Sequence, residues 1–249
     1  MSIDSHMHIN GNIYEDCDKY ISLINNDTKL EGVINVGLDF NTSKQSIRIA
    51  HINPKFYSSV GIHPLYIRSQ VMDDLYLLAD DSKVVAIGEI GMDVSKFNFE
   101  EQREYLINQI IIANDMHLPI IIHSSNCNKQ IVDIFESVVK PKYGCVFHCF
   151  QPDIDTLNYL IYNGYYISFA GKITSLNAKK SLEIASIVPN DLFLVETDSP
   201  FIKIEPNILS IPTNITYVIQ KLADVKQISY DEVENYSINN TKRLFKRII

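Results

Sequence analysis

Residues 84–89 read Val-Val-Ala-Ile-Gly-Glu, and residues 119–123 read Pro-Ile-Ile-Ile-His. Each is a short and almost continuous apolar run, which is typical of a parallel strand covered on both faces. Between the two runs, apolar residues recur at spacings of three and four over 99–117, which predicts a helix with one buried stripe. Asn98 followed by Glu101 suits a capping box at the start of that helix. The segment therefore predicts a strand–helix–strand unit.

The same alternation of strands and helices continues along the rest of the chain. Eight alternations in 249 residues predict a single (β/α)8 TIM barrel that occupies residues 1–249 as one domain. A doubly wound open sheet is the rival, but the sequence has no Gly-x-Gly-x-x-Gly turn and no Gly-rich loop to hold phosphate. The strands are expected at 2–6, 31–36, 56–60, 84–88, 119–122, 145–147, 165–168 and 192–195, and the helices at 15–25, 43–52, 99–117, 153–163, 178–188, 212–223 and 230–246.

The composition narrows the function classes. With 46% hydrophobic and 21% charged residues and only 9 Gly and 9 Pro, the chain is neither disordered nor a low-complexity repeat. No apolar run reaches the ~20 residues that span a bilayer, and the start lacks a secretion signal, which predicts a cytoplasmic protein. The four scattered cysteines exclude a disulfide scaffold. The net charge of −8 argues against a non-specific nucleic-acid coat but not against a nuclease, since a metal supplies local positive charge.

Ionisable residues stand at the carboxyl ends of the expected strands. Asp4, His6 and His8 alternate along the first strand, so strand geometry aims all three at one face. In a barrel the carboxyl ends of the strands form one rim, so residues from distant positions meet there. The histidines at 51 and 117 fall in helical stretches and are assigned no role. The other rim residues are His63, Glu89, His123, His148, Glu196 and Asp198.

Imidazoles and carboxylates that converge without a cysteine suit Zn²⁺, Mn²⁺ or a similar divalent ion. Four imidazoles and two carboxylates exceed the three protein ligands that are typical of one catalytic zinc. A centre of two metal ions with one bridging carboxylate therefore fits the inventory better. Such a pair can activate water near neutral pH and hold the attacking and leaving oxygens, which predicts hydrolysis of a phosphodiester or an amide-like bond.

These motifs resemble the TatD family of metal-dependent deoxyribonucleases, which belongs to the amidohydrolase-like barrel superfamily. The resemblance runs over nearly the whole chain and implies a hydrolase that trims single-stranded DNA from an end, with no membrane or protein partner. It rests on Asp-Ser-His-Met-His at 4–8, Val-Gly-Ile-His-Pro at 60–64, Ala-Ile-Gly-Glu-Ile-Gly-Met-Asp at 86–93, Gln-Arg at 102–103, Leu-Pro-Ile-Ile-Ile-His at 118–123, Phe-His-Cys-Phe at 147–150, Glu-Thr-Asp-Ser-Pro at 196–200 and Asn-Asn-Thr-Lys-Arg-Leu-Phe at 239–245.

The resemblance also implies roles for individual residues. Two divalent cations (Zn²⁺, Mg²⁺ or Mn²⁺) would be bridged by Glu89. His63 would bind or protonate the scissile phosphate, and Asp198 would also take a proton from the attacking water. Asp4 would orient a ligand imidazole, and Glu196 would support the site from beside the eighth strand. The implied ligands are His6, His8 and Asp198 for the first ion and His123 and His148 for the second.

The chain departs from the family where the substrate would bind. Family members commonly carry arginine two residues after the fifth-strand histidine, where Ser125 stands. They usually carry an Arg-Gly-x-x-Asn-rich loop after Pro200, where residues 202–214 contain no arginine. The family's Ser-Gly and Thr-Phe-Lys-Asn are replaced at 151–152 and 174–177. Serine cannot replace the bidentate arginine fork on phosphate, although Lys172 and Lys203 lie on the same rim as point charges.

These losses keep two alternatives open. A metal-dependent hydrolase of a small phosphodiester, an ester or an amide, such as an aminoacyl linkage, suits the missing arginines and the acidic balance. A non-catalytic barrel stabilised by metal fits the intact ligand set less well.

Overall fold

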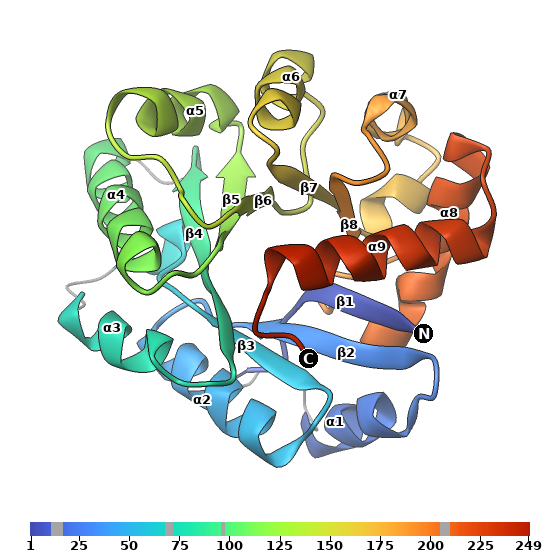
Figure 1. Cartoon of the computed structure of the whole chain (residues 1–249), viewed down its shortest axis with the longest axis horizontal. Helices are drawn as coiled ribbons and strands as arrows, with labels where there is room; N and C mark the ends of the chain where they lie inside the picture. Colours follow the sequence, from blue (N-terminus) through green and yellow to red (C-terminus); the bar gives the residue numbers. More distant parts are fainter. Residues whose placement is uncertain (11–16, 68–71, 96–97, 205–209) are drawn as a thin grey trace.

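A computed structural model describes residues 1–10, 17–67, 72–95, 98–204 and 210–249. Its eight strands are all parallel and pair in the order of the chain, and they lie at the centre with helices around them (Figure 1). A bridge between Met7 and Ser199 joins the last strand region to the first. The predicted (β/α)8 barrel is therefore confirmed. The strands are β1 Ser2–Met7, β2 Leu30–Val36, β3 Phe56–Val60, β4 Val84–Asp93, β5 Ile120–Ser125, β6 Cys145–Phe147, β7 Tyr166–Phe169 and β8 Phe193–Val195.

The helices agree with the prediction except at two places. The helices at Asp73–Ala79 (α3) and Asn128–Ser137 (α5) were not predicted, and neither begins with a side chain that caps its backbone. Residues 15 and 16 of the first predicted helix lie outside the described residues. The other helices are α1 Cys17–Asn26, α2 Phe40–Ile52, α4 Phe99–Asp115, α6 Ile154–Tyr162, α7 Lys179–Ile187, α8 Ile215–Lys226 and α9 Tyr230–Leu244, with 3-10 turns η1 Pro64–Tyr66, η2 Gly171–Thr174 and η3 Pro212–Asn214.

Two local predictions were wrong. The Asn98 side chain does not cap α4 but donates to the carboxylate of Glu101, so the expected capping box does not form. Strands β4 and β5 run on to residues 93 and 125, well past their predicted ends. Glu89 and His123 consequently lie within strands instead of following them, because the pairing of β4 with β5 continues beyond the apolar runs.

The apolar core has two layers, and the alternation of the strands explains the division. Ile120 and Ile122 of β5 belong to a large cluster with the helices, whereas Ile121 belongs to a smaller cluster. The apolar run at 119–123 therefore reads as a strand covered on both faces, as expected. The smaller cluster gathers the inward-facing residues of the barrel with residues of the carboxyl-terminal segment: Ile34, Ile121, Val146, Leu194, Leu244, Phe245 and Ile248.

The carboxyl-terminal segment ends beside β3, opposite the rim (Figure 1). Its Arg247 donates through Nη1 to three backbone carbonyls at the start of β4, those of Ala79, Asp81 and Val84, at 3.1, 3.1 and 2.7 Å. This guanidinium ties the chain end to the turn that precedes β4. Within the described ranges, no helix is both long and apolar enough to cross a membrane.

Candidate metal centre

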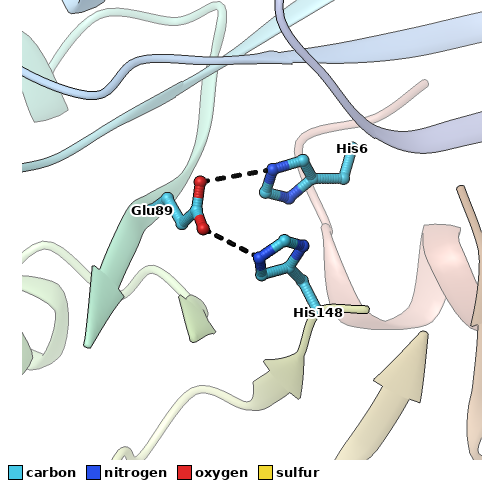
Figure 2. A group of neighbouring side chains, drawn as sticks. All are labelled: His6, Glu89 and His148. Atoms are coloured by element: carbon cyan, nitrogen blue, oxygen red, sulfur yellow. Dashed lines mark ion pairs between the residues drawn. The ribbon is translucent and has the colours of Figure 1, made fainter. Parts of the chain in front are cut away.

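Side chains from six strands meet around one carboxylate at the carboxyl ends of the barrel. Glu89 on β4 lies at the centre of this cluster and is 3% exposed. Figure 2 shows its two oxygens directed at His6 and His148, whose rings stack on each other with centroids 4.1 Å apart. The nearest imidazole nitrogens lie at 3.5 Å (His6), 3.7 Å (His8), 3.4 Å (His63), 2.7 Å (His123) and 2.8 Å (His148) from its carboxylate.

The cluster contains three overlapping sets that can hold a cation. In each set, one donor atom per residue lies within 4.8 Å of the others. Glu89 belongs to two of the sets, and so does His6. The sets are His6, His8 and Asp198; His6, Glu89 and His148; and His63, Glu89 and His123.

Hydrogen bonds to the backbone distinguish two of the histidines. His8 Nδ1 lies 2.9 Å from the carbonyl oxygen of Val36 and must donate to it, so Nε2 keeps a lone pair that faces the cluster. His63 Nδ1 instead accepts from the Leu65 N–H at 3.1 Å, so the ring of a neutral His63 carries its proton on Nε2. His8 therefore presents an Nε2 lone pair that can bind a cation, whereas His63 presents an Nε2 hydrogen-bond donor to the site.

Two carboxylates behind the cluster orient the other imidazoles. His123 Nε2 lies 2.9 Å from Asp93, while its Nδ1 faces Glu89. His148 Nδ1 lies 3.5 Å from Glu196, whose carboxylate also accepts from the backbone N–H of Cys149 and the hydroxyl of Ser168, both at 2.6 Å. Glu196 thus lies where the sequence placed it, in support of the site.

Asp4 has a different partner from the expected one. Its carboxylate accepts from the Thr197 hydroxyl at 2.5 Å, from the Thr197 N–H at 3.0 Å and from the backbone N–H of His6. No imidazole contact to Asp4 occurs among the described residues, so the prediction that it orients a ligand ring was wrong. Instead, Asp4 fixes β1 to the segment that carries Asp198. Burial raises its pKa to about 7.

The cluster contains buried carboxylates but, among the residues that the structure describes, no buried lysine or arginine to balance them. Glu89, Glu196 and Asp198 are all nearly inaccessible, and no lysine or arginine in the described part of the chain is buried. Burial alone would raise the pKa of Glu89, but the imidazoles of His148 and His63 hold it well below its usual range. Burial would lower the pKa of His148, but Glu89 and Glu196 raise it well above normal. A proton on His148 supplies the positive charge that a cation would supply.

The imidazoles at the edges of the cluster are poised to bind a cation. Burial lowers the pKa of His6 and His63, and that of His8 to about 3, so these rings are neutral, which is the state that binds metal. The buried Nδ1 atom of His6 has no hydrogen-bond partner, and that of His148 has only the ion pair with Glu196. Burial, with repulsion from nearby carboxylates, raises the pKa of Asp198 well above normal. The donor set therefore fits divalent cations.

Two buried glutamines of α4 hold the backbone on either side of the site, and sequence reasoning gave them no role. Gln109 accepts from the N–H of Ile62 at 2.7 Å and donates to its carbonyl at 3.1 Å. Gln102 makes the same pair of bonds with Asp93, at 2.8 and 3.1 Å. Seven residues separate the glutamines, which places them on one face of the helix. Their signal in the sequence was a polar residue within the apolar stripe.

A cavity of about 240 Å³ opens from the cluster to solvent. Two aromatic side chains line it, although neither was singled out from the sequence: Tyr66 is 38% exposed and Phe201 is 56% exposed. A larger hollow of about 450 Å³ lies between α4 and α5, beside Arg103 and Asp133, and none of the expected ligands lines it.

Two residues of the site adopt the left-handed backbone region. Asp198 has φ +50° and Cys149 has φ +42°, conformations that are uncommon outside glycine and often mark functional sites. Strand β6 ends at Phe147, before Cys149. Cys149 lies in the following turn and lines a small hollow together with Lys172.

The two histidines that were assigned no role lie away from the cluster. His51 is on α2, where Nε2 pairs with Asp81 at 2.9 Å and the side chain is 49% exposed. His117 follows α4, and its ring packs against Tyr143.

Comparisons with known proteins show the family and the fold of the chain. The model of the TatD related DNase family matches residues 3–246. The uncharacterized metal-dependent hydrolase YabD of Bacillus subtilis is 32% identical, over 99% of this chain and 99% of its own. The 3'-5' ssDNA/RNA exonuclease TatD of Erwinia tasmaniensis is 25% identical, over 93% and 94%. The crystal structure of YJJV, a TatD homolog from Escherichia coli, superposes with a TM-score of 0.91 over 98% of both chains at 23% identity, which shows the shared fold.

Proposed function

The chain belongs to the TatD-related DNase family of metal-dependent hydrolases, and we propose that it is a deoxyribonuclease that removes nucleotides from an end of single-stranded DNA. One observation carries the proposal: candidate metal ligands from on or just beyond five strands gather around Glu89 at the open rim. The relative named as an ssDNA/RNA exonuclease supports the substrate class. The cytoplasmic location expected from the sequence stays a prediction.

We assign two divalent cations, Zn²⁺, Mg²⁺ or Mn²⁺, to the cluster. When bound, such a pair activates water and neutralises charge on the scissile group. Glu89 would contact both ions, because it shares donor sets with imidazoles on either side of it. The Val36 carbonyl holds His8 with Nε2 free for this purpose. The proposed ligands are His6, His8 and Asp198 for the first ion and His123 and His148 for the second, with Glu89 shared by both.

Two side chains of the site, His63 and Asp198, would bind the phosphate and accept the proton. His63 carries its proton on Nε2, which points into the cavity and lies 3.4 Å from Glu89. It would donate this hydrogen bond to a phosphate oxygen. Asp198 also lines the cavity, and its carboxylate would accept the proton of the attacking water. We therefore propose Asp198, His63 and Glu89 as the catalytic residues.

A second candidate keeps the hydrolysis but replaces DNA with a small phosphodiester, an ester or an amide. The observation that favours it is the exposed side chain of Leu176 on the rim. Family members commonly carry a basic residue at this place. A weaker grip on phosphate follows, because an apolar side chain offers neither charge nor a hydrogen bond.

The test is a cleavage assay with single-stranded DNA labelled at either end, supplied with Mg²⁺, Mn²⁺ or Zn²⁺. We expect stepwise shortening that Asp198→Asn abolishes and that His51→Ala, which alters a histidine outside the cluster, leaves unchanged. A parallel panel of small phosphodiesters, esters and amides separates the two candidates. Preference for any of these over DNA, or equal cleavage by Asp198→Asn, would overturn the proposal. Elemental analysis of the purified protein identifies the ions.

A further inference from the structure

Phe201 exposes an aromatic ring at the mouth of the metal site. It follows directly after the Asp198-Ser199-Pro200 segment, lines the cavity beside the cluster and is 56% exposed. The ring centroid lies 5.0 Å from that of His8 at an angle of 62°, so His8 supports one edge of it. Ile202 is buried next to it and anchors the segment. An apolar ring held in this way offers a fixed surface to a flat group that enters the cavity.

Lys172 brings a positive charge to the turn that adjoins the Phe201 segment; it lines the small hollow beside Cys149 and not the metal cavity itself. It lies in the η2 turn that follows β7, and its side chain is exposed. The turn packs against the segment that carries Phe201: a Cβ on Gly171 would lie 3.2 Å from Ile202 Cγ2. The ammonium group is near enough to Asp198 and Cys149 to act on both electrostatically. A ring and a cation therefore stand on two adjoining loops beside the candidate catalytic carboxylate.

Building on the proposed function, we propose that Phe201 and Lys172 hold the terminal nucleotide of the substrate strand, with the base stacked on Phe201 and the adjoining phosphate bound by Lys172. Aromatic rings beside cationic groups are the usual means of holding single-stranded nucleic acid, because every base has a face that stacks. The bases at a single-stranded end are free to leave the strand and stack in this way. Lys172 thus supplies part of the phosphate contact that the missing arginines would make.

The test for Phe201 compares two oligonucleotides that differ only in whether the terminal nucleotide carries a base or is abasic. Affinity is measured by fluorescence anisotropy, and KM and kcat by cleavage. For the end with a base, we expect Phe201→Ala to raise Kd and KM roughly ten- to hundredfold, with kcat changed less than about threefold. The abasic end should respond little, and Phe201→Trp should restore binding. Tyr162→Ala, which removes an exposed aromatic ring at the far end of α6, should have no effect.

The test for Lys172 uses the dependence of Kd on salt. Lys172→Met should weaken binding equally for both oligonucleotides and reduce the slope of log K against log salt by about 0.7, the value for one phosphate contact on a single strand. Lys172→Arg should retain the slope. Lys142→Met, which alters an exposed lysine before β6 at the opposite end of the barrel, serves as the control.

The outcomes separate this inference from the proposed function. If DNA is cleaved but Phe201→Ala changes the binding of the two oligonucleotides equally or not at all, the inference fails and the nuclease assignment stands. The same holds if Lys172→Met leaves the slope of log K against log salt unchanged. If DNA binding depends on Phe201 and Lys172 as expected but DNA is not cleaved, the inference stands and the nuclease assignment fails. If the protein neither binds nor cleaves DNA, both are wrong.

Discussion

Asp93 tests whether a carboxylate behind the proposed ligands controls metal affinity. Its Oδ2 lies 2.9 Å from His123 Nε2, and its Oδ1 accepts from the Ser95 N–H at 2.7 Å. Burial would raise the pKa of Asp93, but the bonds from Ser95 and His123 lower it, so the group is ionised at neutral pH. A charged acceptor at Nε2 fixes the ring and leaves Nδ1, which faces Glu89, as the atom that binds a cation.

Asp93→Asn keeps the shape of the side chain and removes its charge. Substitutions of such orienting carboxylates typically weaken metal binding 10- to 100-fold, which corresponds to about 1.4–2.7 kcal/mol. We expect this loss at the second metal site, to which we assign His123, and little change at the first. A Zn²⁺ titration against a chelating dye measures both affinities, and thermal unfolding of the metal-free protein reports any loss of stability.

The chain offers a closely matched control at Asp81. This carboxylate also accepts from the N–H two residues on, that of Lys83 at 2.9 Å, and contacts a histidine Nε2 at 2.9 Å, but the histidine is the exposed His51. Asp81→Asn should therefore leave metal affinity unchanged and cost at most about 1 kcal/mol of stability. Unchanged affinity in Asp93→Asn, or an equal loss in Asp81→Asn, would refute the reasoning.

Three further substitutions test how the barrel supports the site. Thr197→Val removes the hydroxyl that donates to the buried carboxylate of Asp4 and should lower the free energy of unfolding by about 1–3 kcal/mol in urea. Gly91→Ala would place a methyl group 1.9 Å from the carbonyl oxygen of His123; forcing β4 from β5 should cost at least about 1–3 kcal/mol and weaken Zn²⁺ binding in a dye titration. Arg247→Ala removes three hydrogen bonds to backbone carbonyls and should cost about 2–4 kcal/mol, with metal affinity unchanged.

The barrel was predictable because its signals are local. Short apolar runs alternate with helical stripes, and parallel strands in sequential order leave few topologies open. The prediction missed α3 and α5. A missing capping side chain is not the reason, because α7 and α8 also lack one and were predicted. The true ends of β4 and β5 were missed because polar residues such as Glu89 and His123 interrupt the apolar pattern while backbone pairing continues.

The ring of candidate ligands was predictable for a related reason. Each ligand stands at the carboxyl end of a strand, so the rule that these ends share a rim places them together. Hydrogen bonds between side chains and residues far away in the sequence could not be predicted in this way. Asp4 bonds to Thr197, 193 positions away, and Gln109 bonds to the backbone 47 positions away. No spacing rule indicates such contacts, since they depend on how a helix or loop sits against a strand.

Local charge explains how an acidic chain could hold the proposed DNA substrate. The net charge of −8 describes the whole molecule, but a substrate phosphate in the cavity responds chiefly to groups within a Debye length of about 8–10 Å. There, the buried carboxylates are balanced only by imidazoles. Cations that replace the proton on His148 would turn this neutralised cluster positive, and the exposed Lys172 would add to it. Affinity for phosphate then follows from metal occupancy of the rim and not from the overall charge.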